Sequence, residues 1–204
     1  MSREAFAAAT NVSRETLDQL TVYAERLAKW NRAINLVAKP TLDQTWTRHF
    51  LDSAQLVDYI PEHARTWIDL GSGAGFPGLV IAILRPDISV TLVESDRRKS
   101  VFLQETARAT GADVSVICER AEVVDIKSDI VSARALSSLS DLLELAEPLL
   151  SPEGVCLFLK GENVENELTE ANPLWHIDFK QHASRADPRG TILSITDFHR
   201  RTGA

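Results

Sequence analysis

The sequence predicts an α/β fold: a Rossmann-like, seven-stranded, mostly parallel sheet with a helical extension at its N-terminus. Three observations support this. Short β-rich runs alternate with helix-length stretches from residue 66 onward, the first sixty residues have helical periodicity, and residues 176–199 read as two strands joined by a turn. Strands that alternate with helices form parallel, doubly wound sheets. The 204 residues suit one domain with a small appendage.

Residues 1–62 are predicted to form the helical extension, packed on one compact unit of residues 63–204. Its first helix is indicated by apolar residues that recur at spacings of three and four between Leu17 and Ile34. Ser13 stands just before this pattern, where its hydroxyl is suited to cap the first turn.

A second helix is predicted between two prolines, Pro40 and Pro61. Thr41 and Gln44 match the capping-box pattern, in which a hydroxyl at the helix start is followed by an amide or carboxylate three residues later. The helix is expected to run to about Tyr59, and the second proline then ends it.

The sheet is predicted from five β-rich runs and a terminal strand pair, with three helices between them. The predicted strands are residues 66–70, 89–94, 113–118, 129–133 and 154–160, then 176–184 and 191–199, and the predicted helices are residues 79–84, 99–110 and 139–150. Five strand–helix units with a terminal strand pair fit a seven-stranded sheet better than the six-stranded sheet of dinucleotide-binding proteins.

The totals are those of a globular cytoplasmic protein. With 44% hydrophobic and 25% charged residues the composition is ordinary, and no apolar run approaches the ~20 residues that span a bilayer. The N-terminus lacks the apolar core of a signal peptide. Cys118 and Cys156 fall within predicted strands without metal-ligand spacing, so two buried, reduced thiols and no metal are expected.

The net charge of −7 is unevenly distributed along the chain. Residues 141–170 hold eight acidic side chains against Lys160 alone, whereas residues 1–65 hold eight basic and eight acidic ones. Outside the acidic stretch the chain is therefore neutral, and a surface that faces a nucleic acid is compatible with it. Charge scattered only for solubility is the alternative, and composition does not separate the two.

The segment IDLGSGAGFPG, residues 68–78, contains four of the nine glycines. A strand, a glycine-rich turn and a helix let the backbone approach a nucleotide-like ligand closely, because glycine has no Cβ. Glu94 ends the second predicted strand, 21 residues after Gly73, where a carboxylate receives ribose hydroxyls. NAD and S-adenosylmethionine both present a ribose diol, so this pattern leaves both open.

Two features favour S-adenosylmethionine. Asp69 stands directly before the turn, where a carboxylate opposes a pyrophosphate but suits a ligand with an amino group and a sulfonium. The glycines begin at Gly71, so that Gly-x-Gly-x-Gly follows the strand at once, as in methyltransferases. A nucleotide-linked oxidoreductase and a non-catalytic module that binds S-adenosylmethionine or RNA remain alternatives.

Five motifs between Lys29 and Gly161 resemble those of the bacterial small-subunit rRNA guanine-N7 methyltransferases, the RsmG or glucose-inhibited-division B family. They are KWNRAINLV (residues 29–37), RHFLDS (48–53), DLGSGAGFPG (69–78), SARAL (132–136) and LKG (159–161). The resemblance implies an S-adenosylmethionine-dependent methyltransferase fold. It also implies methylation at N7 of the 530-loop guanine, G527, in 16S rRNA of the small ribosomal subunit or its precursor, and we expect a monomer.

The resemblance also implies a set of cofactor-binding residues. Carried over by position, these are Gly71 and Phe76 at the methionine end, Glu94 at the ribose, Ala121 and Glu122 beside the adenine, and Arg134 in the cofactor pocket. The loop pattern itself adds Asp69 and Gly73 as candidate cofactor-binding residues. Without the resemblance, Glu122 reads as a solvated surface glutamate. A charged Arg134 among apolar neighbours already indicates function.

Arg48, His49 and Lys160 are the candidate substrate contacts, and no catalytic base is assigned. The first two belong to RHFLDS, where Arg48 and Asp52 would form an exposed ion pair if the motif had no function. Lys160 ends the fifth predicted strand, at the edge where such sheets bind ligands. Guanine N7 carries a free lone pair, so methyl transfer requires alignment rather than proton removal.

Overall fold

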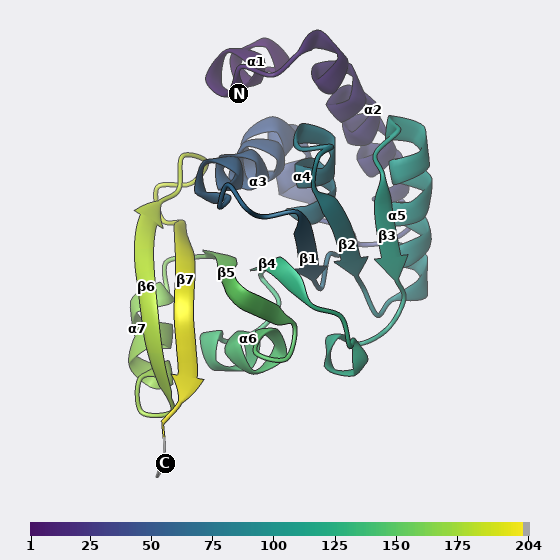
Figure 1. The fold of residues 1–204 in the computed structure, drawn as a ribbon. Helices are drawn as coiled ribbons and strands as arrows, with labels where there is room; N and C mark the ends of the chain where they lie inside the picture. The colour runs from purple at the N-terminus through teal and green to yellow at the C-terminus, as the bar shows by residue number, and fades with distance from the viewer. Residues whose placement is uncertain (202–204) are drawn as a thin grey trace.

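The computed structural model describes residues 1–201, which form a seven-stranded sheet covered by helices on both faces (Figure 1). The strands are β1 Thr66–Leu70, β2 Ser89–Val93, β3 Val114–Ile117, β4 Ser128–Arg134, β5 Leu150–Lys160, β6 Trp175–Ala183 and β7 Thr191–Arg200. Their order is β3-β2-β1-β4-β5-β7-β6, in which β1 to β5 pair in parallel and β7 is antiparallel to both neighbours. The predicted sheet and its terminal strand pair are confirmed.

Six α-helices of at least seven residues accompany this sheet within residues 1–201. They are α1 Arg3–Thr10, α2 Arg14–Trp30, α4 Gly78–Leu84, α5 Arg97–Thr110, α6 Leu139–Ala146 and α7 Val164–Ala171. Ser13 caps α2 as predicted, because its hydroxyl accepts from the backbone N–H of Thr16. Helices α1 and α7 are not among the individually predicted helices. None of the described helices combines the length and apolarity needed to cross a bilayer.

The prediction of a single second α-helix in the extension is wrong. The chain instead passes through the 3₁₀ turn η1 (Lys39–Gln44), the π-helix η2 (Thr45–Leu51), the short α3 (Asp52–Ala54) and the 3₁₀ turn η3 (Gln55–Tyr59). Thr41 does not take part in a capping box, because its hydroxyl donates to the carbonyl of Ala38. Single-turn π-helical segments are concentrated at functional sites.

Two apolar cores lie on the two faces of the sheet. The first joins the extension to α4 and α5 through aromatic side chains, among them Tyr23, Phe50, Phe76 and Phe102. The second lies beneath α6 and α7 and includes Cys156, which is fully buried as expected and whose thiol pKa is raised by burial.

Cys118 contradicts the expectation that both thiols are buried within strands. It is exposed, because β3 ends at Ile117 and the chain turns into a loop at the next residue. Within residues 1–201 no three His, Cys, Asp or Glu side chains are grouped so as to hold a metal ion.

Candidate functional site

Two neighbouring pockets open at the carboxyl ends of the parallel strands. The larger, of about 620 Å³, is lined by Gly71, Ala121 and Glu122 among others, and the smaller, of about 440 Å³, by Arg48, His49, Arg134 and Lys160 among others. Ser137 lines both of them. Ligands of open α/β sheets bind outside this edge, so the pair of pockets is the candidate functional site.

The glycine loop shapes the larger pocket through backbone conformations that L side chains rarely adopt. Gly71, Gly73 and Gly75 have φ values of +61°, +57° and +93°. A Cβ added to Gly71 would lie 2.5 Å from Cδ1 of Leu136, so a side chain here would have to displace that leucine as well as adopt a strained φ. The backbone of the loop therefore has the conformation that its glycines predicted.

Glu94 connects this loop to the start of α5. One carboxylate oxygen, Oε2, accepts from the backbone N–H of Gly73 at 2.8 Å, and the other, Oε1, accepts from that of Asp96 at 2.8 Å. The side chain is nearly buried. Each carboxylate oxygen has a second lone pair, so Glu94 keeps acceptor capacity for a ligand hydroxyl while it braces the loop.

Asp69 does not face either pocket, and the expectation that its carboxylate meets a ligand's amino group is corrected. The side chain is fully buried, with Oδ1 accepting from Ser132 Oγ at 2.6 Å and Oδ2 from the Gly78 N–H at 3.2 Å. Burial raises the pKa of this carboxyl to about 6, against the hydrogen bonds that lower it. Asp69 therefore joins β1 to β4 and to the start of α4.

Phe76 is the centre of a buried ring stack rather than an exposed wall of the larger pocket. The rings of His49 and Tyr23 lie at 14° to its plane, with centroids 4.8 and 5.3 Å away. The Arg134 guanidinium carbon lies 4.8 Å from the Phe76 centroid. The Tyr23 hydroxyl donates to the carbonyl of Ala74, so the extension holds the glycine loop directly.

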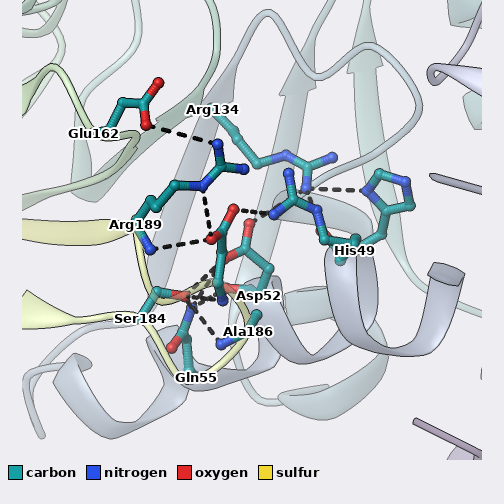
Figure 2. A network of polar contacts seen from close by, with 10 residues as sticks. His49, Asp52, Gln55, Arg134, Glu162, Ser184, Ala186 and Arg189 are labelled. Carbon is teal, nitrogen blue, oxygen red and sulfur yellow. Dashed lines mark hydrogen bonds and ion pairs between the residues drawn. The ribbon is translucent and has the colours of Figure 1, made fainter. Parts of the chain in front are cut away.

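The ion pair between Arg48 and Asp52, which the non-functional alternative required, is absent from the described residues. Arg48 pairs instead with Asp187, in the turn between β6 and β7. Asp52 pairs with Arg134 at 3.4 Å (Figure 2). Residues four apart share a face of an α-helix, whereas the wider i→i+5 turns of η2 rotate them apart. RHFLDS therefore forms contacts with distant strands rather than within itself.

His49 is a neutral ring within this network. Arg134 Nη1 lies 3.2 Å from its Nδ1, and its Nε2 lies 2.9 Å from the Thr41 hydroxyl. Burial, followed by the positive charges of Arg134 and Arg48, lowers its pKa to about 3. With Nδ1 accepting from a cation, the ring is held in one tautomer.

Arg134, which the resemblance implied as a cofactor-pocket residue, lines the smaller pocket. Its Nη1 donates to the backbone carbonyl of Arg48 at 3.1 Å, in addition to its contacts with Asp52 and His49. The guanidinium thus joins the end of β4 to η2 and α3 (Figure 2).

Lys160 reaches the smaller pocket from the end of β5, and its side chain is only 6% exposed. Its ammonium nitrogen donates to the carbonyl of Ser137 at 3.0 Å and lies 2.5 Å from Glu167 Oε2. Glu167 and Asp187 were not among the predicted residues, because one belongs to an unpredicted helix and the other to a turn. Only their spatial position identifies them.

The seven-stranded architecture defines the class first, because solved methyltransferases share it. The structure matches that of M. jannaschii TYW2 in complex with AdoMet with a TM-score of 0.57, at 15% identity, over 83% of this chain and 80% of that one. It matches ribosomal protein L11 methylase of Lactobacillus delbrueckii subsp. bulgaricus with a TM-score of 0.55, at 22% identity, over 73% and 76% of the two chains. The fold is that of the S-adenosylmethionine-dependent methyltransferases.

Sequence comparison then identifies the family. Residues 16–188 match GidB, the rRNA small subunit methyltransferase G family, and the chain belongs to it. It is 52% identical over 202 residues to ribosomal RNA small subunit methyltransferase G of Parvibaculum lavamentivorans, covering 96% of this chain and 89% of the relative. The same enzyme of Rhodospirillum centenum is 53% identical over 193 residues, covering 94% and 89%. The resemblance predicted from the five motifs is confirmed.

Proposed function

We propose that the chain transfers the methyl group of S-adenosylmethionine to N7 of a guanine in 16S rRNA, the 530-loop guanine G527. The observation that carries this proposal is the family match over residues 16–188, together with two pockets that meet at one residue, Ser137. One pocket is available for each reactant. Methyl transfer requires that the two reacting atoms meet in line at this boundary.

The larger pocket fits the cofactor. Its volume of about 620 Å³ lies in the usual range for such sites, and its wall includes Gly71, a glycine at a positive φ that L side chains rarely adopt. Gly71 and Gly73 would approach the methionine end, Ala121 and Glu122 the adenine, and Glu94 the ribose. When bound, S-adenosylmethionine supplies an electrophilic methyl group. Phe76 supports the loop from behind through the ring stack.

The smaller pocket fits a base better than a bare phosphate. Its three cations are each paired with a carboxylate: Arg48 with Asp187, Arg134 with Asp52, and Lys160 with Glu167. A lining with balanced charge attracts a phosphate weakly, while it offers many donors and acceptors to a neutral base edge. His49, neutral and held by Arg134, would pack beside the base rather than exchange a proton.

Two alternatives to this function, an oxidoreductase and a non-catalytic binding module, predict different results. A nucleotide-linked oxidoreductase is disfavoured because residues 16–188 match a methyltransferase family. A non-catalytic module would bind S-adenosylmethionine and RNA without turnover. We further propose that the enzyme acts as a cytoplasmic monomer on the small ribosomal subunit or its precursor, where its substrate is assembled.

One assay tests this proposal. The protein is incubated with methyl-labelled S-adenosylmethionine and with small subunits, or free 16S rRNA, that lack the modification. The modified nucleotide is then identified after digestion, and N7-methylguanosine from the 530 loop is the expected product. Binding without transfer, or label on another atom or on another RNA, would refute the proposed reaction.

A further inference from the structure

Lys160 is the feature of the smaller pocket that the proposed reaction leaves without a defined role. An ammonium group has three N–H donors. Within residues 1–201, one N–H donates to the Ser137 carbonyl at 3.0 Å, and Glu167 Oε2 forms an ion pair with the ammonium nitrogen at 2.5 Å. The nitrogen is thus held by one hydrogen bond and one ion pair, and N–H capacity remains for whatever enters the pocket that Lys160 lines.

The position of the ammonium group indicates which atom of a bound base it can contact. Ser137 lines both pockets, so an ammonium group bonded to its carbonyl lies at the wall between them. A base whose N7 points through this boundary, towards the cofactor, brings the atom next to N7 against the same wall. The identity of that atom distinguishes the two purines.

In guanine that atom is the acceptor O6, whereas in adenine it is the amino group N6. An ammonium N–H can donate to O6 of guanine, whereas at N6 of adenine it would face another N–H donor. We infer that Lys160 selects guanine by donating to O6 while N7 receives the methyl group, and that Glu167 of α7 is the positioning residue that orients the ammonium group. This inference rests on the proposed function and adds the atom by which the base is recognised.

Glu167 is needed to position the ammonium group, because the flexible four-carbon stem of a lysine does not fix its direction. Its carboxylate comes from α7, which begins only four residues after the end of β5. A nearly buried cation also requires a partner, since its desolvation is otherwise uncompensated. One carboxylate therefore supplies the counter-charge and restricts where the ammonium group lies.

The test replaces the target guanosine in the 16S rRNA by inosine or by 2,6-diaminopurine riboside. All three have N7, and the first two have O6 whereas the third has an amino group there. Wild-type enzyme should transfer to guanosine and inosine at similar rates and to the diaminopurine roughly 5- to 150-fold more slowly, the discrimination of one good base contact.

Two variants should lose this discrimination. Lys160→Met should bring the guanosine-to-diaminopurine ratio close to one, and Glu167→Gln, of the same size, should lower it while cofactor affinity is unchanged. Glu170→Gln, at an exposed position of the same helix, is the matched control and should keep the wild-type ratio. Glu167→Gln also serves if the lysine variant does not fold.

Equal transfer to diaminopurine by the wild type, or an unchanged ratio in Glu167→Gln, would overturn the inference while the proposed function stands. A wild-type enzyme that methylates none of the three RNAs would instead refute the proposed function itself, and the inference with it.

Discussion

At the residue scale, Glu94 braces the glycine loop, and we propose that the same carboxylate also binds the ribose. We predict that Glu94→Ala weakens S-adenosylmethionine binding by ~1.5–3 kcal/mol, the scale of hydrogen bonds to a charged group. Calorimetry measures the dissociation constant. Because the variant also frees the N–H groups of Gly73 and Asp96, a thermal melt is the control for folding. An unchanged dissociation constant would mean that the ribose is held elsewhere.

Gly71 is constrained both by its backbone and by its neighbour. With φ at +61°, any side chain strains the loop, and a large one would also displace Leu136 and reduce the pocket. Gly71→Arg should abolish binding of S-adenosylmethionine and of its demethylated product, as measured by calorimetry. Gly111→Arg, at another positive-φ glycine, is the control for backbone strain alone. Normal cofactor binding by Gly71→Arg would contradict this assignment of the larger pocket.

Asp69 should give the stability a pH dependence that can be assigned to one group. Its folded-state pKa of about 6 lies above the ordinary 3.8, so the folded protein binds more protons between these values. The free energy of unfolding therefore loses a contribution as pH rises through this window. Urea unfolding should show that the free energy of unfolding of Asp69→Asn, relative to wild type, rises from pH 4 to 6 and is constant above pH 6. A difference that is constant with pH would contradict the raised pKa.

At the scale of elements, α2 and the glycine loop are joined by one hydrogen bond and one ring stack. Tyr23→Phe removes only the bond to the Ala74 carbonyl, which is worth ~1 kcal/mol, or about 2–4 °C in melting temperature. We predict this loss together with weaker cofactor binding, because the freed carbonyl belongs to the loop. Tyr59→Phe, which packs on His182 instead, should leave cofactor affinity unchanged. Equal effects of both variants would show that the bond does not support the loop.

Also at this scale, the π-helix η2 and the turn between β6 and β7 form the two sides of one pocket. The segments are 139 residues apart in sequence and are joined by Arg48 and Asp187. Asp52, Gln55 and Ser184 add hydrogen bonds between α3, η3 and the same turn (Figure 2). The smaller pocket thus depends on the antiparallel strand pair that distinguishes this sheet.

At the scale of the whole molecule, an acidic protein must bind a polyanion through a restricted surface. Arg48→Ala should reduce methyl transfer to rRNA with little change in cofactor affinity, and the salt dependence of transfer should change little because Asp187 already balances the charge of Arg48. Arg3→Ala is the matched control, because Arg3 also pairs with an aspartate and its side chain is equally exposed, at 35%. Full activity of Arg48→Ala would remove RHFLDS from the site.

The extension and the sheet share one apolar core, since Phe6, Leu20 and Leu27 belong to the same buried cluster as Trp67 and Val90. We therefore propose that residues 1–62 and 63–204 fold as one unit. A chain that lacks residues 1–62 would expose this core and release the glycine loop from Tyr23.

The sequence by itself determined the features that depend on neighbouring residues. Local periodicity predicts where the strands lie along the chain. Local hydrogen bonding and sterics predict the cap at Ser13 and the turn at Gly71 and Gly73. The family could also be predicted from the motifs, because residue identities and spacings are read from the sequence without any knowledge of contacts. These parts of the fold and of the larger pocket were predictable.

The tertiary structure decided which charged side chains meet. The partner of Arg48 lies 139 residues away, and that of Arg134 lies 82 residues away, so no local pattern identifies either pair. Asp69, beside the loop in sequence, turns into the protein because the adjacent strand offers it the Ser132 hydroxyl. A side chain's direction is set by packing and by the cost of leaving a buried charge unpaired, and both depend on residues that only the fold brings near.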